Sequence, residues 1–351
     1  MAVKVAINGF GRIGRLAFRL MFGSKDIEVV AVNDLTPAED LAYYLKYDSA
    51  QGGYKHDISS KEVPTGQKDE KGKDITRGFL IVDGKEIEIY KQKDPKLLPW
   101  KTLQVDVVIE STGRFTKKVE AAAHLEAGAK KVVISAPSDG DVETIVYNVN
   151  HQDIKGDEDI ISGASCTTNC LAPVVKVLDE KFGIVSGLMT TVHAYTNDQS
   201  LLDLAHPKGF MTRRGRAAAA NIVPASTGAA SAISQVLPQL KGKLNGMAFR
   251  IPTVTGSVVD LVIKPAKKVT VEEVNKALKE AANETLGFTM DPIVSSDVIG
   301  TSYGSLVDGL STQLITTGDE QLLKVVSWYD NEMSYTAQLI RTVKYLASKI
   351  K

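Results

Sequence analysis

The stretch Val3-Lys4-Val5-Ala6-Ile7-Asn8-Gly9-Phe10-Gly11-Arg12-Ile13-Gly14 decides the fold of the N-terminal half of the chain. An apolar strand runs into G-x-G-x-x-G, and a helical segment follows at 15–22. In this context the first glycine permits a tight turn, the second lets a pyrophosphate approach the backbone, and the third lets helix and strand pack closely. The pattern predicts a dinucleotide site. Its predicted contacts are Gly9, Gly11, Arg12, Ile13 and Gly14.

A second apolar strand, 27–33, ends at Asp34, 20 residues after Gly14. A carboxylate at this distance accepts a hydrogen bond from the ribose 2′-hydroxyl and repels a 2′-phosphate. We therefore predict NAD rather than NADP as the cofactor. The alternative is a plain glycine turn followed by a solvated aspartate.

Strand-like segments at 105–110, 131–135, 144–149 and 159–162 alternate with helical ones such as 117–127. This alternation predicts an α/β fold with a Rossmann-type doubly wound parallel sheet, which binds ligands at the carboxyl ends of its strands. The loops after two of these strands add the predicted cofactor contacts Thr112, Gly113 and Ser135. The segment 54–78 has no apolar period, so we interpret it as an irregular surface excursion with a solvated charge run.

After residue 164 longer strand-like runs appear at 185–195, 247–251, 257–264 and 322–329. They predict a mixed-sheet α+β domain over 165–332, which we expect to be the catalytic one, after a cofactor domain over 1–164. The terminal helix 333–351 is expected to pack back on the first domain. A capping box, Thr270 with Glu273, is expected to open a helix that serves core packing.

Charge and composition exclude several classes of protein. Forty-two basic and 42 acidic residues cancel, so no long-range field draws nucleic acid or an anionic membrane. No apolar run approaches the roughly 18 residues that span a bilayer, and a cleaved leader would destroy the glycine loop. Two cysteines four residues apart cannot form a disulfide scaffold. We expect a cytoplasmic protein without a metal site.

The run Ala164-Ser165-Cys166-Thr167-Thr168-Asn169-Cys170 supplies a candidate nucleophile. A helix is expected to follow, with Pro173 in its first turn, so that Cys166 lies at the positive end where a thiol pKa falls. The polar neighbours argue against the alternative of a buried structural thiol, which we assign instead to Cys170. His193, 27 residues after Cys166, is the candidate base; the alternative is a hydrogen-bonded core histidine.

The whole chain resembles phosphorylating glyceraldehyde-3-phosphate dehydrogenases. The resemblance rests on the glycine loop and on five later motifs in the same order. These are Asn33-Asp34, Glu110 to Arg114, Ala164 to Cys170, Thr190 to Asp198 with Thr227-Gly228, and Trp328 to Glu332. It implies that Cys166 attacks the aldehyde of glyceraldehyde 3-phosphate, that His193 assists, that NAD accepts the hydride and that inorganic phosphate cleaves the thioester.

The resemblance also implies roles for further residues. The substrate phosphate would be held by Thr196, Asp198, Arg214 and Arg250, and the attacking phosphate by Ser165, Thr167, Thr227 and Gly228. Asn331 would orient the nicotinamide carboxamide. The family further implies a homotetramer with the segment 201–217 near a subunit interface.

The chain departs from the family pattern in three places: the long segment 54–78, Ala205, where many NAD-specific members have proline, and a slightly expanded loop that runs on from Ala205 to Arg213. Two other functions remain alternatives at this level. One is an erythrose-4-phosphate dehydrogenase, and the other is an NAD-binding protein whose main task is interaction.

Overall fold

The computed structural model describes residues 2–68, 74–138 and 141–350. By their contacts these residues form two compact units. The first comprises Met1–Thr144, Ile154–Gly163 and Leu339–Lys351, and the second comprises Ile145–Asp153 and Ala164–Gln338. The junction at 163/164 lies beside the expected boundary at 164/165, whereas 145–153 belongs to the second unit and the division near the C-terminus falls inside the last helix.

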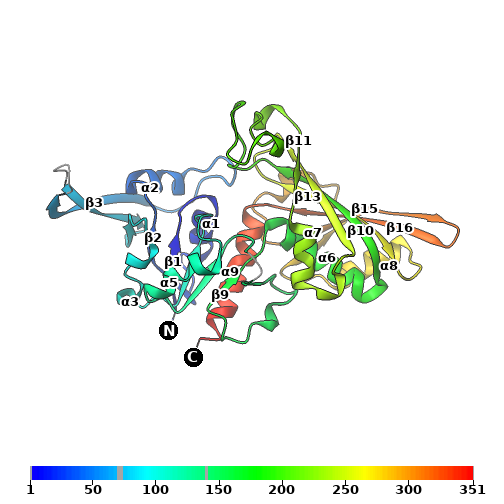
Figure 1. The fold of residues 1–351 in the computed structure, drawn as a ribbon, viewed down its shortest axis with the longest axis horizontal. Coiled ribbons are helices and arrows are strands. Elements are labelled where there is room, and N and C mark those ends of the chain that lie inside the picture. The colour runs from blue at the N-terminus through cyan, green and yellow to red at the C-terminus, as the bar shows by residue number, and fades with distance from the viewer. Residues whose placement is uncertain (1, 69–73, 139–140, 351) are drawn as a thin grey trace. The chain divides into compact units, whose positions relative to one another are not determined.

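The first unit is built on a nine-stranded sheet with the order β3-β4-β5-β2-β1-β6-β7-β9-β8 (Figure 1). Its strands are β1 Val3–Asn8, β2 Ile27–Asn33, β3 Ile58–Lys68, β4 Asp74–Val82, β5 Lys85–Tyr90, β6 Val107–Glu110, β7 Lys131–Ile134, β8 Glu143–Thr144 and β9 Ile160–Ser162. Its helices are α1 Arg12–Met21, α2 Ala38–Lys46, α3 Trp100–Leu103, α4 Lys118–Ala121 and α5 Ala123–Glu126. Following the order in the sheet, all neighbouring strands from β5 through β2, β1, β6, β7 and β9 to β8 are parallel, as predicted. The pairs β3 with β4 and β4 with β5 are antiparallel.

Two glycines explain how β1 turns directly into α1. Gly9 has φ +92° and a Cβ there would lie 2.7 Å from the amide nitrogen of Thr112, while a Cβ on Gly14 would lie 2.0 Å from the carbonyl oxygen of Gly9. Both positions therefore exclude a side chain. A Cβ on Gly11 would meet nothing within 4 Å, which leaves open space above the backbone at the second glycine of the motif.

Two expectations for this half of the chain were wrong. The run 144–149 is a strand only over its first residue; it continues as a turn in which Asn150 accepts a hydrogen bond from the Val146 amide, and its apolar character reflects burial of Val146 in the core of the second unit. The segment 54–78 is not irregular, because β3 and β4 form a hairpin in register from Ile58 opposite Val82.

The hairpin lacks an apolar period because charged side chains of both its strands pair with charged side chains of β5. Lys61 binds Glu86, and Arg77 binds Glu88 at 2.6 Å. Residues 69–73 of the expected charge run lie outside the described residues. The helix expected over 117–127 is present in two short pieces, α4 and α5, which meet at Ala122.

The second unit contains a seven-stranded mixed sheet with the order β11-β12-β10-β13-β16-β15-β14. Its strands are β10 Ile184–Ala194, β11 Val223–Ser226, β12 Leu244–Ile251, β13 Ser257–Pro265, β14 Leu286–Thr289, β15 Ser305–Thr317 and β16 Glu320–Tyr329. Its helices are α6 Cys166–Phe182, α7 Ala229–Val236 and α8 Val271–Glu280, and α9 Met333–Ala347 begins here. The sequence had not predicted β11, β14, β15 or α7.

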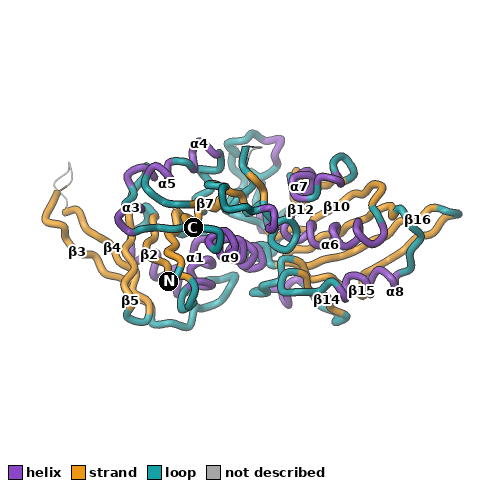
Figure 2. The backbone as a smooth tube through the Cα atoms, turned by 90° about the horizontal axis from the view of Figure 1, so that it is seen from below, coloured by secondary structure: helices purple, strands orange, loops and turns teal. Residues whose placement is uncertain are grey.

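Helices cover the sheet of the second unit. Helix α6 packs on β15, β16, β13 and β10, α7 packs on β12, and α8 packs on β15 (Figure 2). The capping box that opens α8 is present, and Val274 and Leu278 are fully buried, as expected. Along β10, buried Met189, Thr191 and His193 alternate with more exposed residues such as Leu188. This alternation places His193 on the side of the strand that faces the protein interior.

No helix among the described parts of the chain is long and apolar enough to cross a bilayer.

The contrast between Gly14 and Gly11 gives a stability test. Alanine is the better helix former by about 1 kcal/mol, so Gly14→Ala would stabilise α1 if space allowed. The new Cβ would meet the Gly9 carbonyl oxygen, so we expect Gly14→Ala to lower the free energy of unfolding by about 1 to 3 kcal/mol, as at other overpacked sites. Gly11→Ala should change the free energy of unfolding by less than about 1 kcal/mol. Urea unfolding of both variants without cofactor measures this, and equal stabilities would contradict the packing described.

Candidate active site

Cys166 is the first residue of helix α6. Ser165 is the N-cap and its hydroxyl accepts a hydrogen bond from the Thr168 amide at 3.1 Å. Ala164, just before the cap, has φ +59°, a conformation that a residue with a Cβ rarely adopts and that clusters at functional sites. This turn sets the direction in which the chain enters the helix. It thereby places the thiol at the helix N-terminus, as predicted.

The prediction that Pro173 lies in the first turn was wrong. Helix α6 runs from Cys166 to Phe182 with Pro173 in its interior, where the ring nitrogen cannot donate to the carbonyl of Asn169. Cys170, one turn after Cys166, is fully buried among apolar residues, as expected for a structural thiol.

His193 and Cys166 are in direct contact, because the Sγ atom lies 3.3 Å from Nε2 of the imidazole. The Nδ1 atom lies 2.7 Å from the Ala194 carbonyl oxygen and 2.7 Å from Nη1 of Arg250. These contacts are compatible with two tautomers: Nδ1 donates to the Ala194 carbonyl and leaves Nε2 bare towards the thiol, or Nδ1 accepts from Arg250 and Nε2 carries the hydrogen. The first is the tautomer that a base requires.

Both members of this pair are neutral in the resting site. Burial lowers the pKa of His193 to about 3, and the charge of Arg250 lowers it further in the same direction. Burial raises the pKa of the Cys166 thiol, although Arg250 and Thr167 oppose this shift. The expectation that the helix end and the imidazole lower the thiol pKa was therefore wrong, because desolvation of this partly buried thiol outweighs them. The pair is a thiol with an adjacent base rather than a preformed thiolate.

Arg250 is the neighbour of His193 in the parallel pairing of β10 with β12. Its Nη1 donates to the Ala194 carbonyl at 3.0 Å and to the Thr196 hydroxyl at 3.4 Å, and its buried Nε has no partner within the described structure. Thr196 also donates to Asp198, which forms an ion pair with Arg214. Burial and the nearby charge of Arg250 both lower the pKa of Arg214.

This cluster carries two guanidinium groups and one carboxylate next to a neutral imidazole. The repulsion between Arg214 and Arg250 is thus only partly compensated in the free protein. A bound dianion would relieve it, since charge-assisted hydrogen bonds to phosphate oxygens are among the strongest that arginine makes. The geometry therefore brings together Cys166, His193 and the four residues predicted for the first anion pocket.

The residues predicted for a second anion pocket occupy two helix N-termini. Ser165 and Thr167 lie at the start of α6, and Thr227 and Gly228 lie at the start of α7, which packs against α6. The Thr227 hydroxyl accepts a hydrogen bond from the Ala229 amide at 3.2 Å. Helix N-termini favour anions through their free amides and their dipole.

One buried residue beside the thiol was not predicted as a site residue. The hydroxyl of Tyr329, at the end of β16, lies 2.9 Å from that of Thr167 and 2.8 Å from that of Thr191, and its ring meets His193 edge-on. These contacts fix the first turn of α6 against β10. The motif 328–332 was the signal in the sequence, but it did not indicate a role for the tyrosine.

In the first unit, a cavity of about 360 Å³ lies at the carboxyl ends of β1, β2 and β6. Four of the predicted cofactor contacts line it: Gly9, Gly11, Asp34 and Thr112. The Asp34 carboxylate accepts hydrogen bonds from the amides of Phe10 at 2.7 Å and Thr36 at 2.9 Å, so it is held in place with lone pairs to spare. Further lining residues that the sequence did not single out include Asn8, Leu35, Gln92, Lys93 and Phe115.

The other predicted cofactor residues have structural partners near this loop. Arg12 pairs with Asp48 at 2.5 Å, and a Cβ on Gly14 would meet the Gly9 carbonyl oxygen. The Ser135 amide donates to the backbone carbonyl of Glu110. Ile13 follows Arg12 in α1, and Gly113 has φ +71° in the loop after β6. They surround the pocket loops without being among its lining residues.

Asn331 lies in the second unit, directly after β16. Its carbonyl oxygen accepts from the Ser257 hydroxyl at 2.9 Å and the Gly256 amide at 3.2 Å, while the nearby Thr255 hydroxyl donates to Asp330 at 2.8 Å. Two donors on one oxygen fix the orientation of the amide group. Its NH₂ group is therefore the part that can donate to a ligand.

Comparison with known proteins agrees with this geometry. Residues 3–118 match the model for the NAD binding domain of glyceraldehyde 3-phosphate dehydrogenase, and residues 165–331 match the model for the C-terminal domain of the same enzyme. The chain is 57% identical over 348 residues to the glyceraldehyde-3-phosphate dehydrogenase of Clostridium pasteurianum, with 99% of each chain covered. It is 53% identical over 352 residues to that of Streptococcus pyogenes, with both chains fully covered.

The chain belongs to the glyceraldehyde-3-phosphate dehydrogenase family. Membership confirms the predicted α/β fold with a Rossmann-type first half, the assignment as an NAD-dependent oxidoreductase and NAD as cofactor. Within this family fold the thiol and the imidazole lie in the unit that matches the C-terminal domain, and the glycine loop lies in the part that matches the NAD binding domain. Among the described residues no group of three His, Cys, Asp or Glu side chains could hold a metal ion.

The low pKa of His193 makes a measurable contribution to stability. The folded state keeps the imidazole neutral down to about pH 3, whereas the unfolded chain takes up a proton below about pH 6.5. Stability from this group is thus complete above pH 6.5 and is lost as the pH falls below it. Between pH 7.5 and pH 5 the free energy of unfolding of the wild type should fall by about 2 kcal/mol more than that of His193→Asn, since one pKa unit corresponds to about 1.4 kcal/mol. Denaturant unfolding at both pH values measures the difference, and a constant difference would contradict a neutral buried imidazole.

Proposed function

We propose that the chain is a phosphorylating glyceraldehyde-3-phosphate dehydrogenase, which oxidises D-glyceraldehyde 3-phosphate with NAD and inorganic phosphate to 1,3-bisphosphoglycerate in glycolysis and gluconeogenesis. One observation carries the proposal. The Cys166 thiol touches the neutral imidazole of His193, and that imidazole touches Arg250, which lies near a second guanidinium group, that of Arg214. A phosphorylated aldehyde fits this arrangement, because the thiol and the base would meet its aldehyde group and the arginines would meet its phosphate.

The reaction follows from these groups. Nε2 of His193 removes the thiol proton as the sulfur attacks the aldehyde carbon, and it then gives this proton to the former carbonyl oxygen, which completes a thiohemiacetal. His193 then accepts the hydroxyl proton while the carbon loses hydride, which leaves a thioester on Cys166. NAD, when bound, supplies the hydride acceptor. Inorganic phosphate attacks the thioester carbon, the acyl phosphate leaves, and the sulfur is returned as thiolate to be reprotonated.

The two phosphate groups are assigned to different pockets. Arg250, Arg214 and Thr196 would bind the phosphate of the aldehyde, and Asp198 would hold Arg214 in position through their ion pair. Ser165, Thr167, Thr227 and Gly228 would bind the attacking phosphate at the N-termini of α6 and α7. Asn331 would orient the nicotinamide carboxamide with its free NH₂ group.

The decisive experiment is NADH formation with glyceraldehyde 3-phosphate and with erythrose 4-phosphate, each with and without inorganic phosphate. The proposal expects steady turnover of the triose phosphate only when phosphate is present. Without phosphate it expects a burst of at most one NADH per chain. Phosphate-independent turnover of the tetrose phosphate at a higher kcat/KM would instead identify an erythrose-4-phosphate dehydrogenase.

Arg250 gives a prediction that separates phosphate recognition from chemistry. Arg250→Ala removes a charge-assisted contact, so kcat/KM for glyceraldehyde 3-phosphate should fall by an amount equivalent to about 1.5 to 3 kcal/mol. Unphosphorylated glyceraldehyde should be affected much less. Arg216→Ala is the matched control, because this exposed arginine pairs with Asp203. An equal penalty on both aldehydes would assign Arg250 to the His193 base instead of the phosphate.

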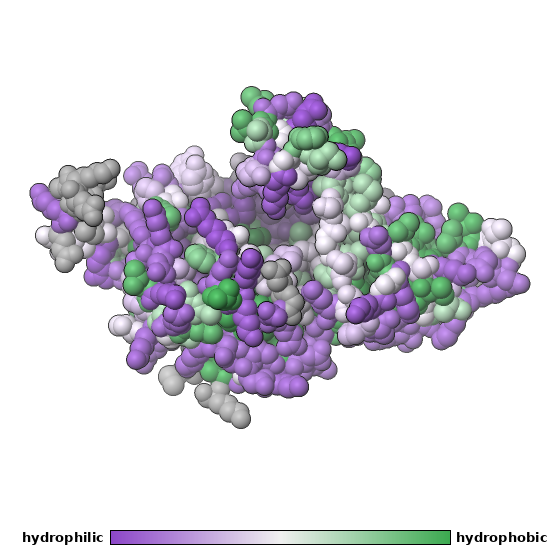
Figure 3. Space-filling model, viewed as in Figure 1, coloured by the Kyte–Doolittle hydropathy of each residue, from purple (hydrophilic) through white to green (hydrophobic). Residues whose placement is uncertain are grey.

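We also propose a homotetramer. The loop between β10 and β11 is closed by its own hydrogen bonds, from Ser200 to Arg214 and from Leu204 to Gly215, yet it exposes large apolar side chains. These are Leu201, Leu202, Leu204, Phe210 and Met211, each more than 70% exposed. Figure 3 shows hydrophobic atoms among hydrophilic ones at the top of the view, where Figure 1 shows the chain near β11. Leu188 of β10 and Met247 of β12 add exposed apolar surface. Surfaces of this kind mark protein interfaces.

Light scattering should therefore give four times the chain mass. Phe210→Asp with Leu202→Asp should shift the mass towards smaller species, because two charges would be buried without partners. A wild-type monomer that turns over at assay concentration would refute the tetramer. We further propose that the protein is cytoplasmic, since free thiols such as Cys166 persist in reducing compartments.

A further inference from the structure

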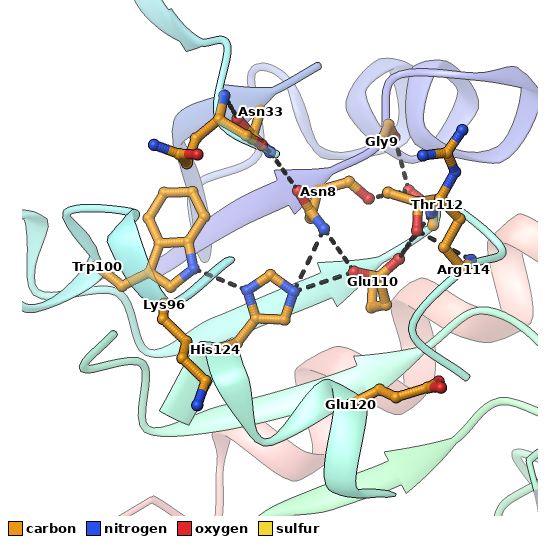
Figure 4. Close-up of polar contacts among 12 residues, drawn as sticks. Asn8, Gly9, Asn33, Lys96, Trp100, Glu110, Thr112, Arg114, Glu120 and His124 are labelled. Atoms are coloured by element: carbon orange, nitrogen blue, oxygen red, sulfur yellow. Dashed lines mark hydrogen bonds and ion pairs between the residues drawn. The ribbon is translucent and has the colours of Figure 1, made fainter. Parts of the chain in front are cut away.

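A row of buried polar side chains crosses the carboxyl edge of the first unit's sheet (Figure 4). It lies beneath the pocket that is lined by Gly9 and Gly11 of the glycine loop. Asn33, at the end of β2, exchanges hydrogen bonds with the backbone of Gln92 after β5 and donates to the Asn8 side chain at 2.6 Å. Asn8, at the end of β1, donates to Glu110 at the end of β6 at 2.5 Å. The order of these contacts is the order β5-β2-β1-β6 of the strands themselves.

The row continues from Glu110 into the helical layer. Nε2 of His124, on α5, lies 3.0 Å from the Glu110 carboxylate, and the indole Nε1 of Trp100, on α3, donates to Nδ1 of His124 at 3.0 Å. Trp100 and His124 are fully buried and Glu110 is 2% exposed. A carboxylate so deep in a protein is costly unless all its lone pairs find donors.

The tryptophan fixes the tautomer of the histidine. An indole nitrogen can only donate, so Nδ1 of His124 must accept and cannot carry a proton. The hydrogen of the neutral ring is therefore on Nε2, which donates to Glu110. Nε2 also lies 3.3 Å from the amide nitrogen of Asn8. This distance is not a hydrogen bond, because both nitrogens donate to the same oxygen of the Glu110 carboxylate.

The other oxygen of Glu110 binds the loop that lines the pocket. It accepts from the Thr112 amide at 2.8 Å and from the Thr112 hydroxyl. Four donors thus reach one carboxylate, two on each oxygen, which matches its acceptor capacity in the ionised form. Protonation, or replacement by an amide, would place a donor against a donor.

We propose that Trp100, His124 and Glu110 form a positioning relay for the dinucleotide, in which an ionised Glu110, held by one tautomer of His124, sets Thr112 and Asn8 in the pocket. The inference rests on the proposed cofactor pocket and deepens it. These three residues touch no substrate; they act through Thr112 and Asn8, which line the cavity. The relay belongs to the first unit alone, so it should tune cofactor affinity without changing the thiol of the second unit.

The other groups near the His124 ring do not compete with Trp100 and Glu110 for its two nitrogens. Phe115 meets the imidazole edge-on, and Glu110 is the acidic group in contact with it. Lys96 and Glu120 appear in the same view, but Lys96 pairs with Glu126 and Glu120 accepts from the Lys117 amide. Among the described residues, the polar contacts of the His124 ring are therefore those with Trp100, Glu110 and Asn8.

The first test compares Glu110→Gln with Glu88→Gln, a carboxylate of the same sheet that pairs with Arg77. NAD binding is measured by calorimetry, with steady-state kinetics and the rate of Cys166 alkylation by iodoacetate in the cofactor-free protein. The relay predicts about 10- to 100-fold weaker NAD binding and a similarly raised KM for NAD in Glu110→Gln. It also predicts kcat within about threefold of wild type and an unchanged alkylation rate. Glu88→Gln should bind NAD normally. Equal NAD affinity in both variants, or equal losses in kcat and in alkylation, would overturn the relay.

The second test needs no change at Glu110. In protein with ¹⁵N-labelled tryptophan, the indole resonance missing from Trp100→Phe belongs to Trp100. A locked tautomer predicts that this resonance stays in place from pH 5.5 to 8.5 with NAD bound, and that Trp100→Phe weakens NAD binding at the acidic end of the range. A shift with a midpoint inside the range would show that His124 titrates and would overturn the proposal. Failure of the wild type to bind NAD at all would refute the proposed function itself, which is a separate outcome.

Discussion

The 3.3 Å contact between Cys166 and His193 is the interaction on which the chemistry depends, and most of the second unit serves to maintain it. The thiol is placed by the turn at Ala164 and the cap at Ser165, and the imidazole by the alternation of β10. Tyr329 ties the two elements together through Thr167 and Thr191. Because the imidazole is buried, the thiol is partly buried and both are neutral, the pair does not require a standing ion pair in a medium of low dielectric.

The surplus positive charge beside this pair has a clear consequence. Arg250 lies against both the base and Thr196, so it links the site of chemistry to the anion pocket. An anion bound there would weaken the field that depresses the pKa of His193, because Arg250 contributes to that shift. Substrate binding is then expected to make His193 a stronger base at the moment when it must take the thiol proton. Arg250 and Arg214 would thus serve both binding and activation.

Local patterns in the sequence were sufficient to predict the backbone framework of the site. The glycine spacing identified the turn into α1, and strand alternation placed Thr191 and His193 on one face of β10. What the sequence did not provide were properties that depend on contacts far apart in the chain. The pKa direction of Cys166 was predicted wrongly because burial, set by the packing of α6 on the sheet, exceeds the effect of the helix end. Asn8, Glu110 and His124 give no local signal of a shared hydrogen-bond network, since they meet only when the sheet has formed. The hairpin of β3 and β4 was missed because charged cross-strand pairs replace the apolar alternation that identifies other strands.

The central claim is that Cys166 forms a covalent thioester with the oxidised substrate. The most direct measurement is mass spectrometry of protein mixed with NAD and glyceraldehyde 3-phosphate in the absence of inorganic phosphate, quenched in acid and digested. The account predicts a phosphoglyceroyl adduct on the peptide that contains Cys166, located on that residue rather than on Cys170, and its disappearance when phosphate is added before the quench. NADH formation without any adduct on Cys166, or an adduct on Cys170, would contradict it.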